Sequence, residues 1–147
     1  MYRHYKNRFE KCKEVTWDDA IAKFSHDFSI GKYSIITDDI ETPPTFYTYT
    51  RGWTGTLSNA FRELNQEESV NNMHLYISFC SDSSTFGRHK DTEDVLIVQS
   101  IGIMHYEFDD GNIITLEPGD GLFIEDGVYH SPIVPGPRVT LSFSLCN

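Results

Sequence analysis

The sequence predicts a mainly β fold, a sandwich or jelly roll of short antiparallel strands, with two helices that precede it and pack outside it. Two observations carry this prediction. From residue 73 onward, short stretches with strand-like alternation are separated by turn residues. Before that point, two stretches show the apolar spacing of amphipathic helices. Short strands with evenly spaced turns are typical of sandwiches and jelly rolls, because each strand reverses the direction of the last.

The two helices are predicted near residues 17–28 and 56–67. Thr16 followed by Asp19 resembles a capping arrangement at the start of the first helix. Apolar residues then recur at helical spacing, namely Trp17, Ile21, Phe24 and Phe28. The second helix has an equivalent set in Leu57, Ala60, Phe61 and Leu64. Residues 33–37 and 46–50 are rich in β-branched and aromatic residues, so we expect strands on either side of the Pro43-Pro44 break.

The later strands differ in how they alternate. Residues 73–80 place Leu75, Ile77 and Phe79 on one face and His74, Tyr76 and Ser78 on the other. Residues 95–98 are continuously apolar, which predicts a strand covered on both faces. Asp110-Gly111 is a strong hairpin signal between 104–108 and 112–116, and residues 138–145 alternate again.

The length of 147 residues predicts one domain, with helices and edge strands in 1–70 and a metal-binding β core in 71–147. The formal net charge of −10 argues against nucleic acid or an anionic membrane as the main partner. Residues 1–13 are an exception, because they carry Arg3, Lys6, Arg8, Lys11 and Lys13. We expect a solvated N-terminal segment, with contact to an acidic partner as the alternative.

The three cysteines, Cys12, Cys80 and Cys146, show no spacing typical of a zinc site or a disulfide framework. This usage fits a reducing compartment, and the sequence contains no apolar run of membrane-spanning length. We therefore expect a cytoplasmic protein that does not bind membranes.

The residues with the strongest chemical signal are His89, Asp91 and His130. Two ligands separated by one residue on a strand point the same way, and a ligand from a later strand can complete one face of an octahedron. Two histidines and one carboxylate arranged in this way form the facial triad of non-haem Fe(II) oxygenases. The alternative is a surface His-x-Asp pair and two tight turns followed by a solvated histidine. The remaining histidines, His4, His26, His74 and His105, are interpreted as structural.

The segment from about 73 to 145 resembles the cupin superfamily, and most of all its JmjC-type and ribosomal-oxygenase-type 2-oxoglutarate oxygenases. His89-x-Asp91, closed by Gly102, resembles the first cupin motif with aspartate as its second ligand. The run from Gly119 to His130 resembles the second motif. The resemblance implies a cupin-type double-stranded β-helix in which the three ligands hold Fe(II), while 2-oxoglutarate and O2 take the remaining metal positions.

One departure from that family concerns the co-substrate. JmjC-like relatives place a lysine or arginine on the strand after the glycine to pair with the distal carboxylate of 2-oxoglutarate, and Met104 stands at that position here. Val95 stands where a polar 2-oxoglutarate contact is expected. Methionine cannot neutralise a buried carboxylate, so this departure counts against 2-oxoglutarate.

Arg138 with Thr140 offers a substitute, because it resembles the R-x-S pattern of other 2-oxoglutarate oxygenases. The alternative is that both residues lie on the outer face of an edge strand, and alternation alone does not decide which face looks into the barrel. Thr85, Tyr76 and Ser78 are further candidates for the lining of the pocket, with an ordinary strand or loop position as the alternative for each.

Three functions remain open. The first is an Fe(II)/2-oxoglutarate oxygenase acting on a small molecule or a protein side chain, and the second is a metal-binding cupin that does not use 2-oxoglutarate. The third is a catalytically silent cupin that serves as a binding module, with a homodimer as a possible assembly.

Overall fold

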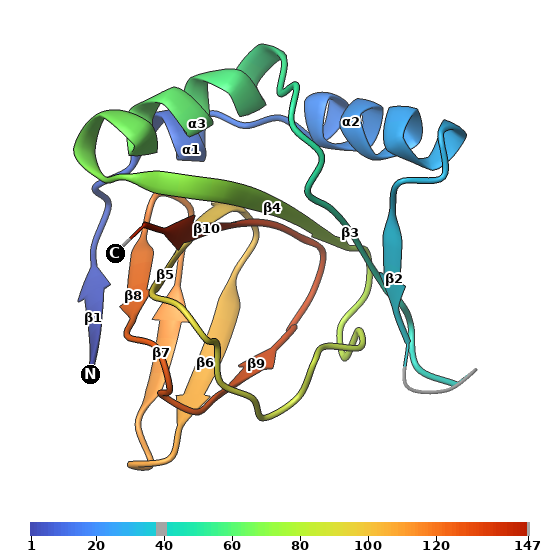
Figure 1. Cartoon of the computed structure of the whole chain (residues 1–147). Coiled ribbons are helices and arrows are strands. Elements are labelled where there is room, and N and C mark those ends of the chain that lie inside the picture. The colour runs from blue at the N-terminus through green and yellow to red at the C-terminus, as the bar shows by residue number, and fades with distance from the viewer. Residues whose placement is uncertain (38–40, 147) are drawn as a thin grey trace.

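The computed structural model describes residues 1–37 and 41–146, and it consists of two facing β-sheets with helices on the outer face of the larger sheet (Figure 1). The helices are α1 (Glu10–Lys13), α2 (Trp17–Ser29) and α3 (Gly55–Glu67). The first strands are β1 (Tyr2–Tyr5), β2 (Ser34–Ile36), β3 (Thr45–Thr48), β4 (Val70–Ser78) and β5 (Val95–Ile101). The later strands are β6 (Met104–Phe108), β7 (Ile113–Leu116), β8 (Gly121–Ile124), β9 (His130–Ile133) and β10 (Arg138–Leu145).

The larger sheet has seven strands in the order β1-β8-β5-β10-β4-β3-β2, and the smaller has three in the order β7-β6-β9. Every pairing between these strands is antiparallel. The predicted jelly roll of short antiparallel strands is therefore confirmed. The 104–116 hairpin is also confirmed as β6 and β7, which are joined through Asp110-Gly111.

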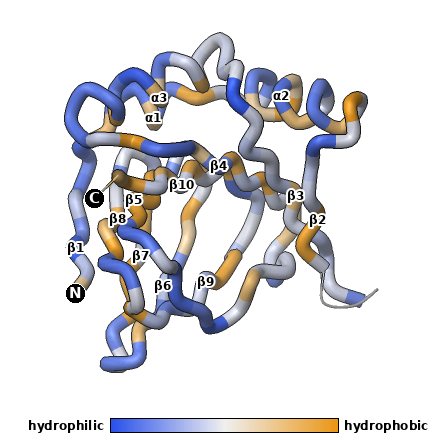
Figure 2. The backbone as a smooth tube through the Cα atoms, viewed as in Figure 1, coloured by the Kyte–Doolittle hydropathy of each residue, from blue (hydrophilic) through white to orange (hydrophobic). Residues whose placement is uncertain are grey.

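Two apolar cores stabilise these layers. One lies between the helices and the larger sheet, and its largest side chains include Phe9, Leu57 and Phe143. The other lies among strands of the two sheets and includes Met104, Tyr106 and Phe108. The strand at 95–101 contributes to both cores, as its continuous apolar run predicts, and Figure 2 shows hydrophobic residues gathered along β5 and β10.

The predicted helices are confirmed as α2 and α3, but the buried face of α2 differs from the expected one. Ile21 and Phe28 are 44% and 54% exposed, whereas Lys23 and Asp27 are buried. Trp17 and Phe24 pack against the core as the spacing predicts, with Phe24 against Phe46 of β3. A polar network through Lys23 and Asp27 is buried beside them.

The prediction of a solvated N-terminal segment is wrong. Residues 2–5 form β1, which pairs with β8 at one edge of the larger sheet. Phe9, the N-cap of the short helix α1, and Cys12 within that helix are buried in the core that also contains residues of α3. The basic side chains of this segment remain exposed, while Phe9 and Cys12 reach the core.

Gly102 fixes the turn between β5 and β6 next to the start of β10. Its φ is +77°, and a Cβ at this position would lie 2.2 Å from the carbonyl oxygen of Pro137. Only glycine allows this approach of the two backbones. The turn therefore positions the residue that follows Pro137, which is Arg138.

No helix in the described ranges has the length and apolar character needed to cross a bilayer.

Candidate metal centre

The three predicted metal ligands come from two segments that meet at a single β-bridge. His89 and Asp91 lie in the connection between β4 and β5, and His130 begins β9. The backbone amide of each histidine donates a hydrogen bond to the carbonyl of the other, over 3.0 and 2.9 Å. The sequence predicts that His89 and Asp91 lie on a regular strand, and the structure places them outside one. The extended bridge nevertheless directs both side chains to the same side.

The ligand atoms converge at one point. One donor atom from each of His89, Asp91 and His130 lies within 4.8 Å of the other two. The Asp91 carboxylate oxygens lie 3.9 Å from Nε2 of His89 and 3.5 Å from Nε2 of His130. His130 is buried, while the other two are partly exposed toward a cavity.

Backbone carbonyls orient both imidazole rings. Nδ1 of His89 lies 2.8 Å from the carbonyl oxygen of Gly87, and Nδ1 of His130 lies 3.0 Å from that of Val128. A carbonyl oxygen only accepts, so each Nδ1 carries a proton, and in the neutral ring Nε2 presents its lone pair. This is the arrangement by which proteins fix the tautomer of a metal-binding histidine.

When both rings are neutral, the atoms that converge at this site are all hydrogen-bond acceptors, namely the two Nε2 atoms and the Asp91 carboxylate oxygens. Burial lowers the pKa of His130, and the neighbouring His89 lowers it further, against the raising effects of the Val128 carbonyl and Asp91. With both rings neutral, two nitrogen lone pairs and a carboxylate face one another, which is unfavourable unless a cation lies between them. Two neutral imidazoles and one carboxylate match the donor set that non-haem iron favours.

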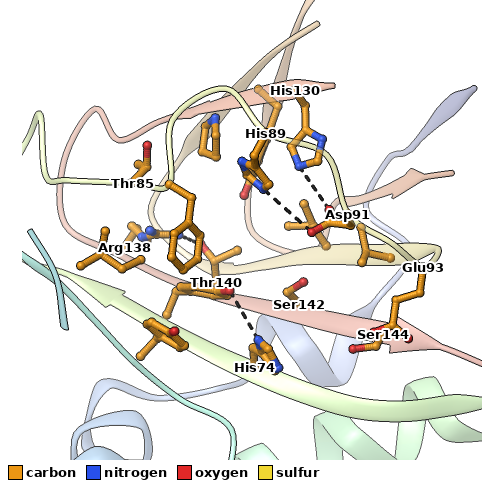
Figure 3. Close-up of a pocket in the computed structure, with 18 of the residues that line it drawn as sticks. His74, Thr85, His89, Asp91, Glu93, His130, Arg138, Thr140, Ser142 and Ser144 are labelled. Carbon is orange, nitrogen blue, oxygen red and sulfur yellow. Dashed lines mark hydrogen bonds and ion pairs between the residues drawn. The ribbon is translucent and has the colours of Figure 1, made fainter. Parts of the chain in front are cut away.

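A cavity of about 250 Å³ adjoins the three ligands. Figure 3 shows Arg138 and Glu93 on opposite sides of this cavity, with His89, Asp91 and His130 above it. A ligand in the cavity can therefore reach the open side of the metal position and a buried cation at the same time.

Arg138 points into the cavity, and the edge-strand alternative is wrong. Its strand, β10, lies between β4 and β5 in the larger sheet and is paired on both sides. Arg138 is only 4% exposed and Thr140 only 1%, and both line the cavity. Burial lowers the pKa of the Arg138 guanidinium, while its proximity to Tyr106 and Tyr76 raises it.

The buried guanidinium of Arg138 has hydroxyl groups as its hydrogen-bond partners. Nε of Arg138 donates to Oγ of Ser78 over 2.8 Å, and Nη1 donates to Oγ1 of Thr140 over 2.9 Å. Thr140 in turn donates to Oε1 of Gln99, so its oxygen is oriented to accept from Arg138. No carboxylate of residues 1–37 or 41–146 forms an ion pair with Arg138.

The other predicted lining residues are also placed at this cavity. Tyr76 and Thr85 line it, and the Arg138 guanidinium carbon lies 5.6 Å from the centre of the Tyr76 ring. Thr85 Oγ1 accepts a hydrogen bond from the amide of Gly87, which leaves its own hydroxyl proton to donate. Val95 contributes an apolar part of the wall, whereas Met104 is fully buried in the core between the sheets.

Sequence reasoning missed several cavity residues, and His74 is the clearest case. It was interpreted as structural, but it lines the cavity, and burial lowers the pKa of its imidazole. Its position on the same face of β4 as Tyr76 is a signal that alternation already contained. Tyr106 and Glu93 also line the cavity, and neither stood out in the sequence.

In sequence, the chain matches no protein-family model and no curated protein. In structure, it superposes on the Escherichia coli ribosomal oxygenase YcfD with a TM-score of 0.69 and 18% identity, over 99% of this chain and 48% of that one. The chain has a ribosomal-oxygenase-like cupin fold. It spans about half the length of YcfD.

Two further structures show the range of chemistry found on this fold. YcfD in complex with cobalt and 2-oxoglutarate matches with a TM-score of 0.56 and 21% identity, over 76% of this chain and 35% of that one. A structure from a study of the DMSP lyases RdDddP and RnDddQII matches with a TM-score of 0.50 and 14% identity, over 69% of this chain and 47% of that one. At these identities the comparisons establish the fold, and the reaction has to be inferred from the residues of the site.

Proposed function

We propose that the protein is a non-haem Fe(II)-dependent oxygenase that uses 2-oxoglutarate to hydroxylate a small molecule or a protein side chain. The observation that carries the proposal is the unpaired guanidinium of Arg138 in the cavity that the three ligands adjoin. A buried cation without a counter-charge is costly, and a bound carboxylate removes that cost. The same cavity thus offers an anion site and a metal site.

His89, Asp91 and His130 would hold the metal through the two Nε2 atoms and the carboxylate. Bound Fe(II) with 2-oxoglutarate supplies the oxidative decarboxylation that activates O2, with succinate, CO2 and the hydroxylated substrate as products. The Gly87 and Val128 carbonyls keep the rings in the metal-binding tautomer. The protein chain thereby prepares the donor atoms before the metal arrives.

Arg138 would bind the distal carboxylate of 2-oxoglutarate. A guanidinium is planar and offers parallel N–H donors, which match the two oxygens of a carboxylate. Nε and one Nη1 hydrogen are engaged by Ser78 and Thr140, so Nη2 and the second Nη1 hydrogen remain for a ligand. The position of these two hydroxyls determines which edge of the guanidinium faces the cavity.

This arrangement accounts for Met104. The resemblance to JmjC-type oxygenases places a cation on the strand that is β6 here, but Met104 packs among apolar residues of the inner core. Arg138 supplies a cation from β10, in the larger sheet. We infer that the carboxylate anchor has moved from one sheet to the other, and that Met104 is compatible with 2-oxoglutarate.

The test is turnover of 2-oxoglutarate in the presence of Fe(II), ascorbate and O2, measured as succinate formed. We expect slow succinate formation by the wild type even without a known substrate. Asp91→Ala removes one of three ligands and should abolish both succinate formation and binding of Fe(II), whereas the exposed Asp18→Ala on α2 serves as the matched control. Metal content unchanged in Asp91→Ala would exclude this site.

A second candidate is a metal-dependent enzyme that binds the carboxylate of its own substrate at Arg138 and does not use 2-oxoglutarate. Met104, at the position where JmjC-type oxygenases carry a cation, is the observation that favours it. Metal binding that depends on Asp91, together with no affinity for 2-oxoglutarate, would identify this second function.

A further inference from the structure

We propose that Tyr106 is a second donor of the carboxylate site, and that its hydroxyl and the Arg138 guanidinium hold the same anionic group from opposite sheets. The proposal rests on the proposed function in that it takes the Arg138 end of the cavity as a carboxylate site. It adds a binding residue that neither the triad nor the R-x-T pattern includes.

The hydroxyl of Tyr106 is the first observation. The residue is 3% exposed, yet it lines the cavity. No hydrogen bond to its oxygen is formed by the described part of the chain. Within residues 1–37 and 41–146, the side-chain polar atoms sealed from solvent without a partner are His4 Nε2, Trp53 Nε1 and Ser100 Oγ. The oxygen of Tyr106 is therefore not sealed, and it opens onto the cavity.

The electrostatic environment is the second observation. Tyr106 and Arg138 are close enough that each changes the proton affinity of the other. Burial raises the pKa of Tyr106 to about 12, although the Arg138 charge acts in the opposite direction. The phenol therefore keeps its proton near neutral pH, and it cannot serve as the counter-charge that Arg138 lacks. It is a neutral donor beside an unpaired cation, and both groups favour an anion.

Strand geometry explains why β6 can provide this donor. Met104 and Tyr106 are separated by one residue, so both side chains face the inner core. Tyr106 pairs with Pro132 of β9, on the smaller sheet, while Arg138 begins β10 of the larger sheet. A carboxylate between them would contact both layers of the jelly roll. The phenol stands two residues after the position at which the resemblance expects a cation.

Tyr76 is a weaker candidate for the same role. Its hydroxyl already lies 3.5 Å from Nδ1 of His74, and the face of its ring is turned to the guanidinium at 5.6 Å. A ring in that position stabilises the cation and offers no proton along the same direction. Of these two phenols next to Arg138, Tyr106 is the one whose hydroxyl is available to a ligand.

The experiment compares Tyr106→Phe with the wild type, using Fe(II)-loaded protein under anaerobic conditions. The dissociation constant of 2-oxoglutarate is measured by calorimetry, followed by those of succinate, acetate and benzoate. A hydrogen bond to a charged group contributes about 1.5 to 3 kcal/mol, so we expect affinity for the bound carboxylate to fall by roughly 10- to 150-fold. Fe(II) affinity should be unchanged. Tyr33→Phe, outside the cavity, is the matched control.

A second readout separates binding from a structural role. No side chain or backbone group of residues 1–37 or 41–146 forms a hydrogen bond to the hydroxyl, so Tyr106→Phe should leave the melting temperature without ligand unchanged and should reduce the increase that 2-oxoglutarate produces. A lower melting temperature without ligand and an unchanged carboxylate affinity would overturn the proposal and make Tyr106 a packing residue.

The carboxylate panel keeps this proposal separate from the proposed function. If 2-oxoglutarate does not bind but another carboxylate binds in a Tyr106-dependent manner, the donor role stands and the co-substrate assignment fails. If 2-oxoglutarate binds equally to both proteins, the co-substrate stands and the role of Tyr106 fails. If the wild type binds no carboxylate, both are overturned.

Discussion

Two buried charged groups in this protein have opposite surroundings. Asp27 on α2 is 0% exposed, and its carboxylate accepts hydrogen bonds from Thr48 and Thr50. Nζ of Lys23 lies 3.4 Å from one carboxylate oxygen, and Nδ1 of His26 lies 3.1 Å from the other. The protein itself supplies every group that this charge requires.

Arg138 is nearly as deeply buried, but its hydrogen-bond partners within the described part of the chain are neutral hydroxyls. Ser78 and Thr140 orient the guanidinium, and no carboxylate of the described ranges forms an ion pair with it. The comparison teaches that burial alone does not distinguish a structural charge from a functional one. A charge that the fold satisfies contributes to stability, whereas a charge that the fold orients and leaves unpaired is available for a ligand.

The largest expected effect is on the free energy of unfolding, when Asp27, the buried charge that the protein itself pairs, is removed. Asp27→Ala removes the acceptor of two hydroxyls and the partner of a buried lysine. Breaking a buried pair in this way costs about 3 to 5 kcal/mol, so we expect a loss of this order in the free energy of unfolding, measured by urea denaturation. Asp18→Ala, an exposed acidic residue on the same helix, is the control. A loss below about 1 kcal/mol would show that the network contributes little.

The unpaired charge should behave in the opposite way. Arg138→Met removes a buried cation that has no counter-charge, so the stability without ligand should be equal to or greater than that of the wild type. Affinity for 2-oxoglutarate should fall at least about 30-fold, because a charge-assisted contact worth about 2 kcal/mol or more is lost. Arg62→Met, at an exposed site on α3, is the control. A destabilised variant with normal affinity would make Arg138 a structural residue.

Low pH should weaken the hydrogen-bond and ion-pair network around Asp27. Burial raises the pKa of Asp27. Hydrogen bonds from Thr48, Thr50 and His26, together with the Lys23 charge, lower it by more than burial raises it, so the folded pKa lies below its ordinary value. The stabilisation is complete above the unfolded pKa of about 3.9 and is lost as the pH falls through the folded value. The stability difference between wild type and Asp27→Ala should therefore narrow below about pH 4. A difference that is constant from pH 7 to pH 3 would contradict this.

The smallest effect concerns the orientation of the guanidinium. Thr140→Val keeps the shape of the side chain but removes the hydroxyl that accepts from Nη1 and donates to Gln99. One such hydrogen bond is worth about 1 kcal/mol, so we expect about a 5-fold loss in 2-oxoglutarate affinity by calorimetry. Ser142→Ala, two residues further on the same face, is a control for the removal of a hydroxyl alone. Equal losses in both variants would argue against a specific role of Thr140.

The sequence predicted the layers of the fold, and it singled out His89, Asp91 and His130, whose side chains converge in the structure, because both inferences depend on local patterns. Strand alternation, the Asp-Gly hairpin and the spacing of His89 and Asp91 are properties of neighbouring residues. The orientation of Arg138 was not predictable, because it depends on the pairing of β10 with β4 and β5.

The segments that were missed depend on contacts between distant residues. Helix α1 is only four residues long, and the side chain of Glu63 on α3 accepts hydrogen bonds from the amides of Lys11 and Cys12 at its start. β1 is a strand because β8 is beside it. The position of Tyr106 on the cavity wall likewise depends on how the two sheets face each other.

The most direct test of the central claim is an anaerobic absorption titration, in which Fe(II) and then 2-oxoglutarate are added to wild type and Arg138→Met. We predict a visible metal-to-ligand charge-transfer band in the wild type at low 2-oxoglutarate concentration. In Arg138→Met the band should appear only at concentrations at least about 30-fold higher. A wild-type protein that binds Fe(II) but develops no band, or a band with the same concentration dependence in both proteins, would contradict a 2-oxoglutarate site built on Arg138.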